Sequence, residues 1–344
     1  MKTPYFEFSK GIINENWQMM RALLSPCSLY YAMKANSAEC VIDVLVDIGA
    51  AFDVASINEF EMLLLKNVRP QDIICSLPVK SVEMIQQLYT KQCRYFVFDC
   101  YEELVKLRKY APNSKKILRI DVDELGGEYI PYGMPYDEFL SYKENDPAFL
   151  DDISGVTFFL LENTSFERLK TALHIVEKVI SYINRDGLIV NIGGSYCTDF
   201  DEMENFFSSF EQFAYELIDK YRVNFYAEPG RSIVLSAGSI ITKINLIRIR
   251  KDDVEVFIDA GQQTKITFTP SVIEILNRNS SYSENVITYH FYGPLSSHVE
   301  LFSFSTPMIF KEEDIIKLNR MGAYSNCFAS HWHGLPFAEI IMKE

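Results

Sequence analysis

Two motifs in the first half of the chain place a reactive or charged side chain after an apolar run. The run SLYYAM is followed by Lys34, and the run FDVAS carries Asp53. A lysine at the closed end of an apolar, aromatic strand is partly desolvated, which suits it to form a Schiff base. Taken alone, Lys34 is more often an ordinary lysine that snorkels at a strand end. Asp53 is equally a turn or helix-capping residue, although Ser56 competes for the capping role.

Two later motifs combine small residues with charge. The run VNIGGSY delivers Gly193, Gly194 and Ser195 just before a helical stretch, where backbone N–H groups can hold an anion. The run FYAEPGRS places Glu228 at a strand end and Arg231 within reach of a phosphate. Such a glycine pair is more often only a turn, and such a glutamate is often a structural salt-bridge partner.

Strand-like and helical textures alternate up to about residue 230, and these elements must position the motifs. The strand-like runs are 28–33, 51–54, 72–74, 95–98, 116–120, 155–160, 188–192 and 224–228. Repeated strand–helix units indicate a parallel sheet with covering helices. Seven of these runs have clear helical partners, which favours a (β/α)8 TIM-type α/β barrel, with one strand missed or irregular, over an open sheet. The motifs then fall at the carboxyl ends of barrel strands, where the working residues of such barrels lie.

The texture changes after residue 230. Segments rich in Val, Ile, Thr and Tyr, separated by Gly, Pro, Asn and Ser, predict a mostly antiparallel β domain; they are 231–250, 254–260, 286–292 and 338–342. We therefore expect a barrel over residues 12–230 and a β domain over 231–344. Residues 121–152 are an acidic insertion between barrel units.

Composition narrows the classes of partner and compartment. The chain of 344 residues has 33 basic and 47 acidic residues, a net charge of −14, which disfavours nucleic-acid binding. Its seven cysteines include no C-x-x-C pair, and zinc-type clustering is absent, so we expect no metal site. We see no signal peptide and no apolar run long enough to cross a membrane, which predicts a cytoplasmic protein.

Read in order, seven motifs resemble one family. YYAMKAN, FDVAS, ILRI, NIGGSY, AEPGR, GPLSS and MGAYSN are similar to motifs of the fold-type III pyridoxal-phosphate decarboxylases, which include ornithine, arginine and diaminopimelate decarboxylases. The resemblance covers nearly the whole chain and is strongest over residues 3–120 and 187–235. The opening TPYFEF resembles the family's N-terminal strand, which assigns residues 1–11 to the β domain. The resemblance implies pyridoxal 5'-phosphate (PLP) as cofactor and a head-to-tail homodimer whose active sites are completed by the partner's β domain.

The resemblance also implies roles for individual residues. Lys34 is the lysine that forms the internal aldimine, and Glu228 pairs with the pyridine nitrogen. The other implied cofactor contacts are Asp53 and Arg119 near Lys34, and Gly193, Gly194, Ser195, Arg231 and Tyr324 at the phosphate. A carboxylate keeps the pyridine nitrogen protonated, and the pyridinium is the electron sink that decarboxylation needs. Alanine racemase, which shares the barrel, has an arginine at this point, so Glu228 favours decarboxylation over racemisation.

The sequence departs from the family at four positions. Phe159, in GVTFF, stands where relatives carry a histidine that stacks on the cofactor ring, and phenyl can stack but cannot hydrogen-bond. Ser296 and Ser297, in GPLSS, stand where ornithine decarboxylase has a catalytic cysteine and an aspartate for the distal amine. Ala260 matches a second distal aspartate.

Two residues near these positions are candidates for substrate chemistry. Because Ser296 is a poor proton donor near neutral pH, His298 is the candidate that returns a proton to the substrate carbon. Trp332 is a candidate lining residue for the substrate, with core packing as the comparable alternative. Three readings follow from all these residues. The first is a decarboxylase of an amino acid or an amino-acid conjugate other than ornithine or lysine. The second is an inactive relative that acts as a binding or regulatory protein, and the third is a PLP-dependent racemase or other lyase.

Overall fold

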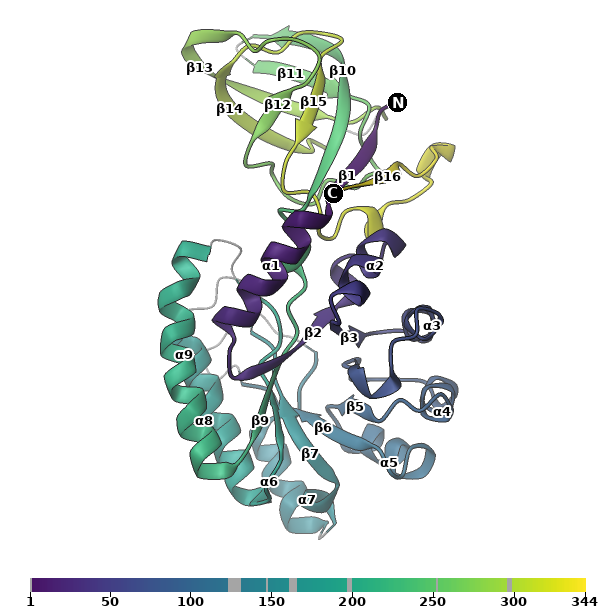
Figure 1. Cartoon of the computed structure of the whole chain (residues 1–344), viewed down its shortest axis with the longest axis vertical. Coiled ribbons are helices and arrows are strands. Elements are labelled where there is room, and N and C mark those ends of the chain that lie inside the picture. The colour runs from purple at the N-terminus through teal and green to yellow at the C-terminus, as the bar shows by residue number, and fades with distance from the viewer. Residues whose placement is uncertain are drawn as a thin grey trace. The chain divides into compact units, whose positions relative to one another are not determined.

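The computed structural model describes residues 2–122, 131–146, 148–160, 166–196, 200–251, 253–295 and 299–344 (Figure 1). The chain forms two compact units. The β unit consists of Met1–Asn16, Ala35–Val44 and Ile233–Glu344, and the barrel unit consists of Trp17–Lys34 and Leu45–Ser232. The division of the sequence at residue 230 stays a prediction, because the two units are interleaved along the chain. Residues 12–16 and 35–44, which that division gives to the barrel, group with the β unit.

Eight parallel strands close into a barrel, which confirms the (β/α)8 prediction. In order around the barrel they are β2 (Cys27–Ala32), β3 (Ala51–Val54), β4 (Ile73–Cys75), β5 (Tyr95–Phe98), β6 (Lys115–Arg119), β7 (Ile153–Thr157), β8 (Ile189–Asn191) and β9 (Asn224–Ala227). Strand β2 pairs with both β3 and β9 and so closes the ring. Parallel strands covered on both faces need continuous apolar runs, and these strands are almost entirely buried.

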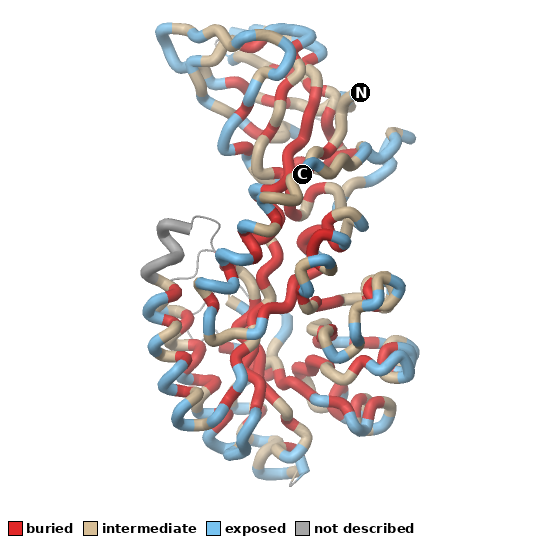
Figure 2. Tube along the Cα trace, in the orientation of Figure 1, coloured by how far each residue is buried: buried red, intermediate tan, exposed pale blue. Residues whose placement is uncertain are grey.

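Helices cover the outside of the barrel with amphipathic faces. In α8 (Phe166–Ile183), Leu169, Leu173, Val176 and Ile180 recur at helical spacing and are buried. Figure 2 shows the same pattern, with buried strands inside and exposed outer helix faces. The remaining helices are α1 (Lys10–Leu23), α2 (Glu39–Asp47), α3 (Ile57–Leu65), α4 (Val82–Thr90), α5 (Tyr101–Tyr110), α6 (Tyr136–Asn145), α7 (Phe149–Asp152), α9 (Phe200–Tyr221) and α10 (Arg231–Val234), with short 3-10 turns η1 (Met33–Ala35), η2 (Pro70–Asp72), η3 (Asn326–Phe328) and η4 (Trp332–Gly334).

The insertion expected at residues 121–152 carries two helices that the sequence did not reveal. Helices α6 and α7 are held by a pair of buried aromatic side chains, Phe139 and Phe149, whose ring centres lie 5.8 Å apart. Both helices are short and acidic, which hides their apolar anchors from a periodicity search. No helix in the described ranges has the length and hydrophobicity that a membrane span requires.

The β unit contains a mostly antiparallel sheet, as predicted. Its strands are β1 (Tyr5–Ser9), β10 (Gly238–Arg250), β11 (Asp253–Ile258), β12 (Ile273–Ile275), β13 (Tyr282–Tyr292), β14 (Phe302–Met308), β15 (Ile315–Leu318) and β16 (Glu339–Lys343). Strand β1 pairs antiparallel with β10 and parallel with β16. Strand β11 also pairs parallel with β13. Strand β10 begins later than the run predicted from residue 231, because Arg231–Val234 forms α10.

Candidate functional site

Three charged residues predicted from the sequence meet at the carboxyl ends of the barrel strands, which we call the rim. Lys34 lies in η1 directly after β2, Asp53 lies on β3, and Glu228 follows β9. The Lys34 ammonium is close enough to lower the pKa of both carboxyl groups, against the raising effect of their burial. The rim therefore brings together one amine and two carboxyl groups.

The Asp53 and Glu228 carboxyl groups are both buried, and the Lys34 ammonium acts on the pKa of each. Burial raises the pKa of Asp53 well above its usual range, and repulsion from Glu228 raises it further. Burial also raises the pKa of Glu228, although Lys34, a hydrogen bond from Asn191 and the charge of Arg119 oppose the increase. A cationic or N–H-bearing ligand group beside Glu228 would therefore be stabilised.

Asn191 fixes the Glu228 carboxylate, and the sequence analysis did not single it out. The Asn191 Nδ2 donates a hydrogen bond of 2.5 Å to Glu228 Oε1. The Asn191 Oδ1 accepts a hydrogen bond of 3.0 Å from the backbone N–H of Gly193. The sequence feature that could have indicated Asn191 is its place as a polar residue at the end of the apolar strand before the glycine pair.

The glycine pair is required by a close approach of two loops. Gly193 has φ +70, in the left-handed region that favours glycine. A Cβ at Gly194 would lie 1.6 Å from the carbonyl oxygen of Glu228, so only glycine fits. The loop after β8 therefore lies directly against the loop after β9, beside the rim carboxylate.

Arg231 and Ser195 belong to the same corner of the rim. The Tyr196 hydroxyl donates to the Gly193 carbonyl at 2.8 Å, and Arg231 Nη2 donates to the Tyr196 carbonyl at 3.1 Å. Ser195 lies on this turn and is partly buried. A glycine turn without side chains, with an arginine beside it, has the composition of a phosphate-binding corner.

Arg119 ends β6 and lies against two aromatic rings. Its guanidinium carbon is 5.6 Å from the centre of the Phe159 ring and 5.5 Å from that of Tyr132. Burial lowers the pKa of Arg119, while the carboxylates of Asp99 and Glu228 oppose that change. The sequence predicted Arg119 and Phe159 at the rim, but nothing in the insertion pointed to Tyr132.

Asp53 does not cap a helix. The Ser56 hydroxyl caps α3 by accepting from the backbone N–H of Glu59 at 3.2 Å, and Glu59 Oε2 accepts from Ala55 N at 2.7 Å. This reciprocal pair is a capping box. Asp53 instead accepts from the backbone N–H of Ser76, after β4, at 3.2 Å.

A second lysine after a barrel strand, Lys80, is buried and fully engaged. Its Nζ lies 3.0 Å from Glu103 Oε1 and donates to the carbonyls of Leu77 at 2.8 Å and Val97 at 2.6 Å. The carboxylate and the two carbonyls take up the hydrogen-bonding capacity of this buried ammonium, so Lys80 is a structural group and not a nucleophile.

The other predicted site residues lie in the β unit or outside the described residues. Tyr324 has its backbone N–H hydrogen-bonded to the Ala35 carbonyl at 2.9 Å, and its ring stacks on Phe328. Trp332 is 49% exposed, which leaves it available to a ligand and argues against core packing. Residues 296–298, which include the predicted Ser296, Ser297 and His298, lie outside the described residues.

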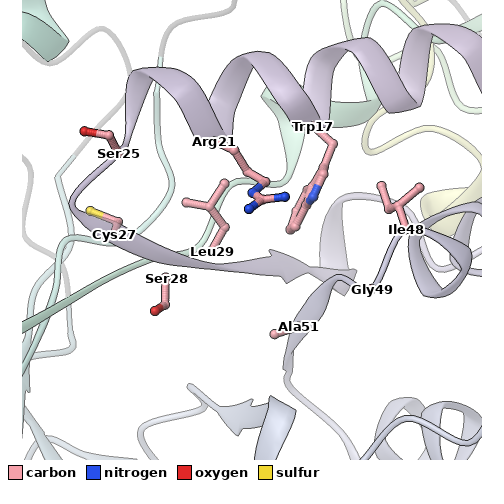
Figure 3. Close-up of a pocket in the computed structure, with 9 residues that line it drawn as sticks. All are labelled: Trp17, Arg21, Ser25, Cys27, Ser28, Leu29, Ile48, Gly49 and Ala51. Atoms are coloured by element: carbon pink, nitrogen blue, oxygen red, sulfur yellow. The ribbon is translucent and has the colours of Figure 1, made fainter.

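A pocket of about 370 Å³ lies at the opposite end of the barrel strands. It is lined by residues at the starts of β2 and β3 and by α1, from which Trp17 and Arg21 point toward Leu29 (Figure 3). None of the residues singled out for chemistry lines it. It is therefore separate from the rim.

The residues at the rim fit PLP. They offer an amine, a carboxylate oriented by an amide, and a glycine turn where a side chain has no room, next to an arginine. Residues 10–241 match the family model described as "Pyridoxal-dependent decarboxylase, pyridoxal binding domain". The chain therefore belongs to the fold-type III PLP-dependent decarboxylase family, whose cofactor is PLP.

Individual relatives agree with this family. A probable ornithine decarboxylase of Dictyostelium discoideum is 26% identical over 73% of this chain and 56% of that protein. Antizyme inhibitor 2 of Xenopus laevis is 27% identical over 66% of this chain and 51% of that protein. The matches thus span little more than half the length of these two relatives. The arginine decarboxylase of Paramecium bursaria Chlorella virus, solved with agmatine, shares the fold with a TM-score of 0.88 at 21% identity, covering 100% of this chain and 96% of that one.

Proposed function

We propose that this protein is a PLP-dependent decarboxylase that acts on an amino acid, or on an amino-acid conjugate, other than ornithine or lysine. The observation that carries the proposal is the Glu228 carboxylate, oriented by Asn191 at 2.5 Å and set at the same rim as Lys34. When bound, PLP supplies a protonated pyridine ring that accepts the electrons left behind by loss of carbon dioxide. A carboxylate is the group that stabilises such a protonated nitrogen.

Each rim residue has one task in this proposal. The Lys34 amine would hold the cofactor covalently through its aldehyde. Glu228 holds a proton on the ring nitrogen, and Asn191 keeps the carboxylate turned toward it. Asp53 and Arg119 balance charge around this pair.

The phosphate end is assigned to the glycine corner. Gly193, Gly194 and Ser195 offer backbone and hydroxyl donors, and Arg231 adds a positive charge. Tyr324, from the β unit, is the further phosphate contact that the family resemblance implies.

The excluded substrates follow from charge. A distal ammonium entering a partly dry site costs several kcal/mol unless a carboxylate meets it. Ala260 and Ser297 stand at the two positions where ornithine decarboxylase has aspartates. The neighbouring Asp259 already accepts from the hydroxyls of Thr3 at 2.6 Å and Thr242 at 2.7 Å. The carboxylate of Glu300 is occupied by His290 at 3.1 Å.

The substrate side of the proposal rests on the β unit. In this proposal His298 returns a proton to the substrate carbon, Ser296 and Ser297 take the places of the catalytic cysteine and distal aspartate of ornithine decarboxylase, and Trp332 lines the substrate. By the family resemblance, these residues reach the rim of a second copy in a head-to-tail homodimer. The expected product is the amine of the substrate.

One observation favours a second function, that of an inactive relative that binds a regulatory partner. Xenopus antizyme inhibitor 2 is among the relatives, and Phe159 replaces the histidine expected at the ring face. The retained amine, carboxylate and phosphate corner oppose this reading, because a chain without catalytic function has little use for them.

The test begins with the purified protein and PLP. We expect an absorbance band near about 420 nm, and a borohydride-reduced adduct that mass spectrometry locates on Lys34. Lys34→Ala should lose both, whereas the exposed control Lys91→Ala should keep both.

The substrate is then sought in a panel of amino acids and amino-acid conjugates, by measuring carbon dioxide release and the mass of the product. Efficient release from L-ornithine or L-lysine would contradict the substrate proposal. A bound cofactor with no release from any substrate would favour the inactive relative, and an inverted substrate would favour a racemase.

A further inference from the structure

The arginine at the rim is flanked by two aromatic side chains that come from different loops. Tyr132 comes from the insertion after β6, and Phe159 from the loop after β7. The guanidinium carbon of Arg119 lies 5.5 Å and 5.6 Å from their ring centres. A guanidinium within about 6 Å of a ring centroid is attracted to the face of the ring. Two such contacts restrict Arg119 more than one contact would.

The segment that carries the tyrosine is tied to the strand that carries the arginine. The Met134 N–H donates to the carbonyl of Arg119 at 2.9 Å, and the Asp121 N–H donates to the carbonyl of Met134 at 2.9 Å. The Gly133 N–H donates to Asp99 Oδ2 at 3.3 Å. Gly133 has φ +110, and a Cβ there would lie 3.0 Å from Asp121 N, so glycine lets the segment lie against the strand. This stretch of the insertion is therefore a built part of the rim.

Acidic groups that follow three different barrel strands act on the arginine. Asp99 follows β5, Asp121 follows β6, and Glu228 follows β9; each favours the charged guanidinium. The Tyr132 hydroxyl belongs to the same group. If the contacts with the two rings were removed, the guanidinium of Arg119 could turn toward any of these three carboxylates.

The position of the Arg119 guanidinium affects how strongly the ionised form of Glu228 is favoured. The groups that face it are Lys34 from η1, Asn191 from β8, Arg119 from β6 and the competing carboxyl group of Asp53 from β3. If Arg119 turns toward another carboxylate, one of the two cationic groups that favour the charged form of Glu228 is lost.

We propose that Tyr132 and Phe159 are positioning residues of the cofactor site, which hold the Arg119 guanidinium in place at the rim where PLP would bind. This inference rests on the proposed function, because it assumes that PLP binds at the rim. It gives the insertion after β6 a part in cofactor affinity. It also gives the phenyl ring at position 159 a task that does not require a hydrogen bond.

The test compares the affinity of cofactor-free variants for PLP by absorbance titration at pH 6 and pH 8. Tyr132→Leu should bind PLP about three- to tenfold more weakly than the wild type, and the loss should be larger at pH 6. The reason is that Glu228 then takes up a proton more readily as pH falls. Tyr132→Phe keeps the ring face and should bind PLP as the wild type does.

A matched control removes an equivalent tyrosine elsewhere on the barrel unit. Tyr182 is 43% exposed, against 46% for Tyr132, and Lys143 Nζ lies 4.5 Å from its ring centre. Tyr182→Leu should leave PLP affinity unchanged at both pH values. If Tyr132→Leu does not fold, Tyr132→Met provides the same comparison, because a flexible thioether also lacks a ring face for the guanidinium. The inference is overturned if Tyr132→Leu binds PLP as tightly as the wild type or if Tyr182→Leu loses as much. A wild type that binds no PLP overturns the proposed function itself, and the inference with it.

Discussion

Glu228 is central to the proposed reaction, and its surroundings act on its pKa in two opposite directions. Its neighbours must keep it ionised to hold a protonated ring nitrogen, while burial raises its pKa. Lys34, Asn191 and Arg119 meet the first demand from three different elements. The ionised state of Glu228 therefore depends on these three neighbours. A substitution of Glu228 can change the rate of the reaction without removing the residues that bind PLP.

Glu228→Gln should retain PLP but decarboxylate about a hundredfold more slowly or worse. The glutamine oxygen still accepts the hydrogen bond from Asn191, but a neutral amide no longer favours a protonated ring nitrogen. Steady-state kinetics with the identified substrate, together with the absorbance band, separates rate from binding. The control Glu211→Gln removes a partly exposed carboxylate that accepts a hydrogen bond from the Ser25 hydroxyl, and should leave both unchanged. Unchanged turnover in Glu228→Gln would make the residue structural.

Asp53→Asn should stabilise the cofactor-free protein at neutral pH. Burial raises the pKa of Asp53, so the folded state binds this proton more tightly than the unfolded chain, whose aspartate has a pKa near about 3.9. Stability contributed by this group therefore falls as pH rises from about 4 through the folded-state pKa. Urea unfolding should show that Asp53→Asn raises the free energy of unfolding at pH 7.5, by an amount that shrinks toward zero at pH 4.

The exposed Asp219 provides the control for that measurement. Asp219→Asn changes the same functional group on the surface of α9 and should alter the free energy of unfolding little at either pH. A variant Asp53→Asn that is less stable than the wild type at both pH values would show that Asp53 is ionised and net stabilising in the folded chain.

At the scale of the element, the loops after β8 and β9 act as one unit. The backbone of Gly194 touches that of Glu228, and the Glu228 N–H donates to the Gly193 carbonyl at 2.7 Å. Any shift in one loop therefore moves the other. The phosphate corner and the rim carboxylate keep their spacing because the backbone itself joins them.

Gly194→Ala should lower the free energy of unfolding by about 1–3 kcal/mol and weaken PLP binding severely. The new Cβ would lie 1.6 Å from the Glu228 carbonyl oxygen, so the two loops must separate. Gly11→Ala is the matched control, because its Cβ would lie 3.7 Å from Ser9 Oγ in an ordinary contact. Thermal unfolding and PLP titration of both variants test this. Equal behaviour of the two would refute a packed joint between the loops.

The sequence predicted the elements that carry strong local patterns and missed those defined by contacts. The strands at 51–54 and 95–98 were placed correctly because short apolar runs bounded by polar residues mark buried parallel strands. Lys34 and Glu228 follow such strands and Asp53 lies near the end of one, so all three were predicted at the carboxyl ends of the barrel strands. Asn191 and Tyr132 were missed because their importance lies in hydrogen bonds and ring contacts with residues far along the chain.

At the scale of the whole molecule, the proposed dimer makes a prediction about mixed variants. Lys34→Ala and His298→Ala should each be inactive as pure proteins. If active sites are shared head to tail, a mixed dimer contains one site with both native residues, so an equimolar mixture regains about a quarter of wild-type activity. Each variant mixed with itself is the control. A mixture that stays inactive, although subunits exchange, would place both residues in the same chain's site.

The pairing of β1 with both β10 and β16 sets an order of events during synthesis. Tyr5–Ser9 precedes every barrel strand in the sequence, whereas its partners Gly238–Arg250 and Glu339–Lys343 follow all of them. One edge of β1 therefore stays unpaired until β10 has been translated, and the other edge until β16 has been translated. We expect a nascent chain with an unpaired strand edge to need chaperones, because that edge can pair with a strand of another nascent chain.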